Sequence, residues 1–271
     1  MGLLRPKFGI RKVALGLAAV AIAALILGVT KSAALGPAGS YTSIVFADGF
    51  ESGDLSHWNG LLGNGSATAT AAAAHTGSYG LRLSNGSGQF QVLAKGLDQP
   101  LTDSSMTFWV RIASGAGFQT VAEARDGSSS AHMWDLYYDG GQQAFHLYPY
   151  NSTGSTEIFT GNGSAPSGTW LKVEIQYTAT AAGGARIYIN DQTQASWTVT
   201  GDYTRSANFQ RIQLWNDGAN VTDFDDVTVG TPPGAPRYAM SCATPSISNR
   251  QLRNRPTMIG ESMSASALGA V

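Results

Sequence analysis

The chain has 271 residues, of which 43% are hydrophobic and only 13% charged, and its 17 basic and 18 acidic side chains give a net charge of −1. This composition, with 33 glycines and 6 tryptophans, excludes a coiled coil and argues against global disorder. A single cysteine, Cys242, rules out an intrachain disulfide.

The charge is distributed unevenly, which divides the chain into three regions. Residues 1–39 carry 5 basic and no acidic side chains, residues 40–230 carry 8 basic and 17 acidic, and residues 231–271 carry 4 basic and 1 acidic. The middle region therefore has a net charge of −9. Because neutralising phosphates requires clustered lysine and arginine, this acidic middle region predicts that nucleic acid is not a partner.

Residues 1–39 have the pattern of an export signal. Basic residues between Arg5 and Lys12 precede an apolar run from Val13 to Val29, which is followed by small residues including Ser32 and Ala34. This order is typical of a cleaved signal peptide, although the run is also long enough for a signal anchor in the membrane. In both cases we expect the rest of the chain to be secreted or displayed on the extracellular face, with membrane contact only through this segment.

Residues 40–230 are predicted to form one all-β domain. From Ile44 onward, short alternating runs are broken by Gly, Asn, Ser and Asp about every ten residues, which is typical of a sandwich or barrel. The run over 106–112 alternates in this way, as do the runs over 171–177 and 185–189. In the first of these, Phe108, Val110 and Ile112 are expected in the core, with Trp109 and Arg111 on the other face.

The next run, from Phe118 to Arg125, is predicted to be a strand with the same alternation. Its pattern places Phe118, Ala122 and Ala124 in the core. Glu123 and Arg125 are then expected on the outer face.

A hairpin is predicted at residues 139–142, where Asp-Gly-Gly-Gln forms a two-residue turn. In that register Leu136 opposes Phe145 in the core, and Asp135 opposes His146 on the other face. The outer face of the hairpin carries Asp135, Tyr137, His146, Tyr148 and Tyr150.

Residues 231–271 lack any alternating or helical pattern. Thr231 to Pro236 is predicted to be a stiff, proline-rich linker, and the remainder a disordered basic tail. The tail could bind acidic envelope polymers through Arg250, Arg253 and Arg255, or could be an extension without a function.

Three segments of the middle region resemble a known superfamily: Asp48 to Trp58, Ala74 to Leu83, and Phe224 to Val229. They are similar to secreted bacterial domains of the concanavalin-A-like (laminin-G-like) jelly-roll superfamily, over residues 44–230. The resemblance implies two stacked antiparallel sheets, adjacent first and last strands, and a glycan surface on the outer face of one curved sheet. Members include lectins, carbohydrate-binding modules, glucanases and polysaccharide lyases, so the ligand is not specified.

The expected architecture is therefore an all-β, two-sheet antiparallel jelly-roll sandwich over residues 40–230. An N-terminal apolar signal or anchor helix precedes it in residues 1–39, and a proline-rich linker and disordered tail follow in residues 231–271.

A structural calcium site is the first candidate for a functional site. Glu51 follows the first expected strand, and Asp225 and Asp226 lie in the last, so neighbouring strands would bring these carboxylates together. Asp48 is a weaker fourth ligand. This arrangement resembles related jelly-roll modules, in which an early acidic residue and a late aspartate bind calcium. The alternative is that these acids serve turns and caps.

A polar sheet face is the second candidate. If the strands that carry them are neighbours, one surface displays Trp109, Arg111, Glu123, Arg125, Asp135, Tyr137, His146 and Tyr148. Aromatic rings stack on sugar faces, and carboxylates and guanidinium groups bind hydroxyls. The alternative is that the aromatics serve packing and that Asp135 with His146 is a cross-strand pair.

Catalysis on that face is the third candidate. His146 as base, Tyr148 as acid and Arg111 or Arg125 near a uronate carboxylate would make a polysaccharide lyase, with Asp135 orienting His146. The short motifs of known jelly-roll lyases are missing around these residues. The Glu-x-Asp string of glucanases with this fold is missing too, which disfavours a glycosidase.

The sequence therefore favours an exported, lectin-like module that binds polysaccharide or glycoconjugate without turnover. The alternatives are a polysaccharide lyase and a structural or adhesive surface module. Because the middle region is acidic, a neutral or weakly acidic glycan is the expected partner. The sequence predicts neither the sugar nor the oligomeric state.

Overall fold

The computed structural model describes residues 40–127, 131–192, 197–204 and 209–233. The predicted export signal in residues 1–39 and the predicted tail in residues 237–271 lie outside the described residues. Within the described ranges, no helix is long and apolar enough to span a membrane.

The described residues form two antiparallel sheets, with one short 3-10 helix, η1 (Ala71–Ala73). Sheet A has the strand order β13 (Trp197–Gly201), β12 (Gly183–Ile189), β11 (Leu171–Thr178), β6 (Asp103–Ile112), β15 (Val221–Thr231), β4 (Gly80–Ser84) and β3 (Ser66–Thr70), and β1 (Ser43–Asp48) also pairs with β15. Sheet B has the order β10 (Ile158–Phe159), β9 (Ala144–Pro149), β8 (His132–Asp139), β7 (Phe118–Asp126), β14 (Phe209–Asn216), β5 (Gln91–Leu101) and β2 (Gly60–Gly63).

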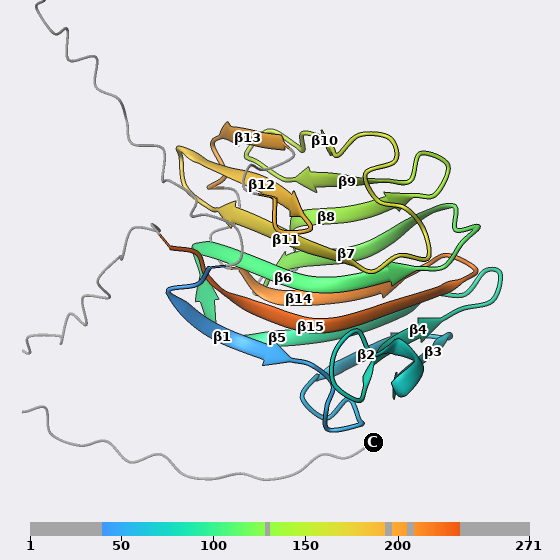
Figure 1. The fold of residues 1–271 in the computed structure, drawn as a ribbon. Coiled ribbons are helices and arrows are strands. Elements are labelled where there is room, and N and C mark those ends of the chain that lie inside the picture. The colour runs from blue at the N-terminus through green and yellow to red at the C-terminus, as the bar shows by residue number, and fades with distance from the viewer. Residues whose placement is uncertain (1–39, 128–130, 193–196, 205–208, 234–271) are drawn as a thin grey trace, which may run out of the picture. The chain divides into compact units, whose positions relative to one another are not determined.

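The sheets stack face to face, as Figure 1 shows, and the predicted two-sheet antiparallel sandwich is confirmed. The long strand β15 pairs with β6 along one edge, and with β4 and then β1 along the other. The first and last strands are therefore neighbours, as the resemblance implied.

The core lies between the sheets and follows the predicted alternation in most strands. Phe108, Val110 and Ile112 of β6 are buried, and so are Val173 and Ile175 of β11. Removing these side chains from water is the main force that holds the two sheets together.

Strand β7 departs from its predicted alternation at Phe118, whose ring is 59% exposed. Thr120 pairs with Tyr137 and Ala122 with Leu136, so Val121 is an extra residue in the strand. Such a bulge reverses which side chains face the core. The prediction that Phe118 is buried was wrong for this reason.

The hairpin between β8 and β9 is two residues out of its predicted register. Tyr137, rather than Asp135, pairs with His146, because the loop has four residues and is closed by Asp139 and Ala144. The Asp139 carboxylate accepts hydrogen bonds from the backbone of Gly141 and Gln142, which stabilises the wider turn. A shift of two preserves the faces, so Asp135, Tyr137, His146 and Tyr148 still point outward.

Candidate functional site

The outer face of sheet B carries six of the eight side chains predicted for binding. Cross-strand partners point to the same side of a sheet. Glu123 of β7 pairs with Asp135 of β8 and with Gln213 of β14, and Tyr137 pairs with His146 of β9. We call this surface the sheet B face. It comprises Phe118, Glu123, Arg125, His132, Asp135, Tyr137, His146, Tyr148, Tyr150, Arg211 and Gln213.

A second bulge, in β8, brings His132 to the sheet B face. Ala124 pairs with Trp134 but Arg125 pairs with His132, so Met133 is the extra residue. Strict alternation would place His132 in the core with Trp134. The bulge instead sets His132 beside Arg125.

Two hydrogen-bonded groups meet at the centre of this face. Arg125 donates through Nε to Glu123 (2.8 Å) and to Gln213 Oε1 (2.8 Å). His132 Nδ1 bonds both oxygens of Asp135 (2.7 and 2.9 Å), and the Tyr150 hydroxyl donates to the same carboxylate (2.9 Å). Both carboxylates therefore have donors in place before any ligand binds.

Burial and mutual repulsion set the electrostatics of this centre. Glu123 is 5% and Asp135 1% exposed. Burial raises the pKa of Glu123, the nearby Asp135 charge raises it further, and Arg125 opposes both effects. Burial, followed by the charge of Asp135, also raises the pKa of Tyr137, so this phenol stays protonated at neutral pH.

Glu123, His132 and Asp135 could also hold a metal ion, because their ligand atoms lie within 4.8 Å of one another. They are the one such group that the described residues contain. Arg125 bonds Glu123, and His132 and Tyr150 bond Asp135. Both carboxylates thus already have hydrogen-bond partners without a cation.

His146 belongs to a separate group at the edge of the face. Its Nδ1 lies 2.5 Å from Glu157 Oε1, and the Tyr148 hydroxyl donates to the same oxygen (3.0 Å). His146, followed by Tyr148, lowers the pKa of Glu157. The His146 Nε2 atom is buried and has no hydrogen-bond partner among the described residues. The predicted orientation of His146 by Asp135 is therefore not what the structure shows.

Aromatic rings cover this edge of the sheet B face. Phe118 stacks on Tyr137 with 5.3 Å between centroids, and Tyr148 meets Tyr137 edge to face at 5.6 Å. Phe118 also contacts His146 at 5.8 Å. The exposed Phe118 ring thus packs against Tyr137 and His146.

A hollow of about 280 Å³ opens at the other edge of the face. It is lined by Asn59, Gly60, Leu62, Ala94, Gly96, Arg211 and Gln213. Three of these residues are glycine or alanine, so the floor lies low between the polar side chains. The hollow therefore meets the Arg125 group at Gln213.

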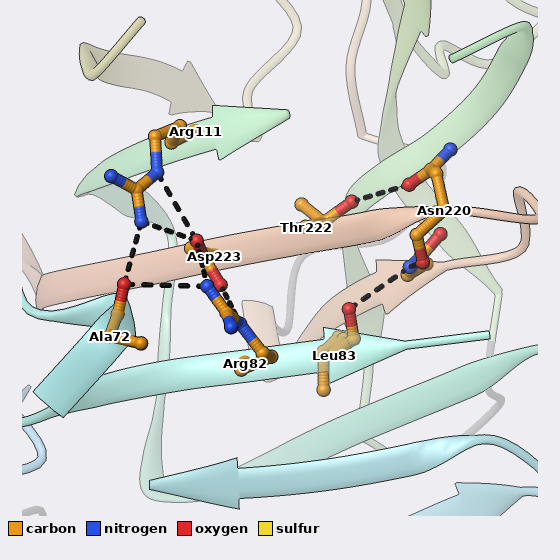
Figure 2. Close-up of polar contacts among 8 residues, drawn as sticks. Ala72, Arg82, Leu83, Arg111, Asn220, Thr222 and Asp223 are labelled. Carbon is orange, nitrogen blue, oxygen red and sulfur yellow. Dashed lines mark hydrogen bonds and ion pairs between the residues drawn. The ribbon is translucent and has the colours of Figure 1, made fainter. Parts of the chain in front are cut away.

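Trp109 and Arg111 do not share this surface, because β6 belongs to sheet A. Trp109 stacks on His75 at 3.8 Å, and Arg111 pairs with Asp223 of β15 (Figure 2). The predicted cluster of eight residues is therefore divided between two sheets, since the sequence does not specify which strands are neighbours.

Three of the four acids predicted to bind calcium border one loop, residues 75–79. Glu51 accepts hydrogen bonds from the backbone of Ser78 and Tyr79, and Asp225 accepts them from the backbone of His75 and Thr76. The backbone N–H groups of one loop thus satisfy both carboxylates.

The other two acids differ in position. Asp226 accepts from the Thr76 hydroxyl and lies near Gly49, just before Glu51. Asp48 points elsewhere, because its oxygens bond Trp58 Nε1 (2.7 Å) and the backbone of Phe50 (2.9 Å). Glu51, Asp225 and Asp226 therefore all bond the loop over residues 75–79, whereas Asp48 does not.

Comparison with solved structures supports the fold. The endo-beta-1,4-glucuronan lyase from the fungus Trichoderma reesei superposes with a TM-score of 0.55 at 12% identity, covering 70% of this chain and 96% of that one. The cellulose induced protein Cip1 gives 0.53 at 16%, covering 69% and 97%. The globular domain of T. cruzi calreticulin gives 0.50 at 11%, covering 69% and 88%. These likenesses support an all-β, two-sheet sandwich fold.

No protein-family model and no curated protein sequence matches the chain. At these identities the structural likenesses establish the fold alone.

Sequence reasoning missed several residues of the sheet B face. His132 and Phe118 were assigned to the wrong face or left out because bulges change the alternation. Gln213 and Arg211 lie on β14, which is far along the chain from β7. An outward position in an alternating strand was their one signal, and it does not reveal the neighbouring strand.

Proposed function

We propose that the sheet B face binds polysaccharide or another glycan. One observation carries this proposal: the exposed Phe118 ring and the half-buried tyrosine rings beside it continue into a hydrogen-bonded carboxylate and guanidinium group beside an open hollow. Rings stack on the C–H faces of sugars, and pre-positioned charged groups bind hydroxyls in pairs. One of the solved structures with this fold is a glucuronan lyase, which is consistent with this ligand class.

We further propose that the domain acts outside the cytoplasm, exported through residues 1–39. A structural calcium ion held by Glu51, Asp225 and Asp226 belongs to the same proposal. It is supported by the convergence of these acids on one loop.

Glycan binding is tested with the Phe118→Ala variant. Phe118 is 59% exposed, so its removal should leave folding intact while losing stacking worth a factor of about ten in affinity. A printed array of neutral and acidic polysaccharides selects the ligand, and titration calorimetry measures its affinity. Tyr79→Ala is the matched control, because this ring is 39% exposed and lies beside Gly53 instead.

Two results would contradict the proposal. In the first, the full chain retains no glycan on the array. In the second, Tyr79→Ala weakens binding as much as Phe118→Ala does, which would place the contact away from the sheet B face.

A polysaccharide lyase is a second candidate, favoured by the His132 and Asp135 pair. With Nδ1 held by Asp135, His132 can accept a proton through Nε2. In β-elimination the base removes the C5 proton of a uronate and the C4–O bond breaks. A C4=C5 double bond then forms, and the leaving oxygen takes a proton. Tyr150, on the same carboxylate, can supply that proton, and Arg211 can face the uronate carboxylate.

His146 does not fit the role of general base predicted for it from the sequence, because Glu157 bonds one ring nitrogen and the other is buried. Ultraviolet absorbance of the unsaturated product over uronic-acid polymers tests the lyase. His132→Ala should abolish product and His146→Ala should retain it. If the native chain forms no product, the lyase hypothesis is wrong and the glycan-binding proposal is unaffected.

A further inference from the structure

The outer face of sheet A carries a cluster of arginines that the sheet B face does not use. Asp223 of β15 lies between Arg111 of β6 and Arg82 of β4, as Figure 2 shows. Arg82 bonds both of its oxygens (2.8 and 3.0 Å), and Arg111 bonds Oδ2 twice (2.7 and 3.2 Å). Each guanidinium also donates to the carbonyl of Ala72.

The charges of this cluster do not cancel. Two guanidinium groups face one carboxylate, so the cluster keeps a net positive charge within a domain that is acidic overall. Asp225 is the next outward acid on β15, but its carboxylate accepts from the backbone of His75, Thr76 and Asp226.

Each arginine has N–H donors that the bonds to Asp223 and Ala72 do not use. The bonds to Asp223 and Ala72 use Nε and Nη2 of both side chains, and within the described residues neither Nη1 has a hydrogen-bond partner. In Figure 2 this third nitrogen of Arg111 points away from Asp223 and Ala72. The Arg82 and Arg111 side chains are 32% and 30% exposed. A second anion can therefore reach them while Asp223 stays bound.

Space for that anion is already present. A hollow of about 340 Å³ is lined by Arg82, Arg111, Ala113, Gly168, Val221 and Asp223. Small side chains at Ala113 and Gly168 leave it open beside the arginines.

An aromatic platform borders the same cluster. The Trp170 ring lies 4.7 Å from the Arg111 guanidinium carbon, and His75 contacts both Trp170 and Trp109. An arginine that is stacked on an aromatic ring and fixed by a carboxylate holds its remaining Nη1 donors in place for an oxyanion.

We propose that this hollow is a second binding site, on the sheet opposite the sheet B face, for a carboxylate or sulfate group of an acidic saccharide. The charged group binds the Nη1 donors of Arg82 and Arg111, and the sugar ring lies against Trp170. A domain with a site on each outer face can bridge two glycan chains, which raises its overall avidity.

The test follows the Trp170 indole N–H resonance of the full chain by NMR, assigned with a Trp170→Phe variant. The probes are a galacturonate tetramer, its methyl ester and a sulfated galactose oligomer. An acidic probe should shift the resonance and the neutral ester should not. Arg111→Lys keeps a charge beside Asp223 but loses the Nη1 donors, and should weaken binding about tenfold.

Arg211→Lys, in the sheet B hollow, is the matched control and should leave the titration of the Trp170 resonance unchanged. Unfolding midpoints of both variants check that the fold is retained. Comparing the two acidic probes distinguishes a carboxylate site from a sulfate site. The proposal is overturned if neither acidic probe moves the resonance, if the ester moves it equally, or if Arg111→Lys binds as tightly as the native chain. None of these outcomes depends on binding at the sheet B face.

Discussion

At the scale of single residues, the domain buries several carboxylates and satisfies most of them. Asp48, Asp223 and Asp225 each accept hydrogen bonds from at least two groups. Asp103, at the start of β6, is the exception. It is 5% exposed, and its Oδ1 has no hydrogen-bond partner among the described residues. A buried carboxylate with an unsatisfied oxygen destabilises the folded state when it is ionised.

We therefore expect Asp103→Asn to stabilise the folded state by an amount that depends on pH. Burial raises the pKa of Asp103 in the folded state above its unfolded value. The folded state therefore holds the proton more tightly, and stability is lost as pH rises from the ordinary aspartate pKa through the raised one. Asparagine removes this loss, so the variant should be more stable by about 1 kcal/mol at pH 8 and gain little at pH 4.

Urea unfolding midpoints at the two pH values measure the difference. Asp98→Asn, an exposed carboxylate on β5, is the control and should change neither midpoint. An equal gain for Asp103→Asn at both pH values would show that ionisation is not the cause.

At the scale of elements, alternation sets the faces of the strands while loops and bulges set their registers. The β8–β9 loop shows this best. Gln143 adopts a left-handed conformation with φ 50°, which side chains tolerate at a cost and glycine adopts freely.

Gln143→Gly should therefore stabilise the domain by up to about 1 kcal/mol, and Gln143→Val should destabilise it by a similar amount. Denaturant midpoints provide the measurement, with Gln142→Gly as the control because Gln142 has no positive φ. The four-residue turn would be contradicted if the Gln143→Gly variant were less stable than the native chain. The predicted two-residue turn requires positive φ within Gly140 and Gly141 instead.

The sequence could predict the outward position of Asp135, Tyr137, His146 and Tyr148, because that depends on local alternation. It could not predict the hydrogen bond of His132 with Asp135. That contact requires a bulge at Met133, and a bulge depends on how the neighbouring strand packs.

At the scale of the whole molecule, the first and last strands close the sandwich, and Glu51, Asp225 and Asp226 gather where they meet. If calcium binds there, a concentration about a hundredfold above its Kd should stabilise the fold by about 2.7 kcal/mol and raise Tm by about 5–10 °C.

Differential scanning calorimetry with excess calcium and with chelator measures this shift. Glu51→Gln with Asp226→Asn should abolish it, whereas Asp54→Asn, an exposed acid in the same loop, should keep it. Equal melting temperatures with calcium and with chelator would contradict the proposed calcium site.

The sequence by itself determined the fold class, the core strands and the acidity of the domain. Each of these follows from side-chain alternation or from composition, which are local or additive properties. The superfamily resemblance added that the first and last strands are neighbours. The tertiary structure alone decided which outward faces form one surface. It placed β6 in the sheet opposite β7, β8 and β9, so Arg111 joins Arg82 and Asp223 instead of Arg125. Strand order depends on packing between residues distant in the chain, which no local pattern encodes.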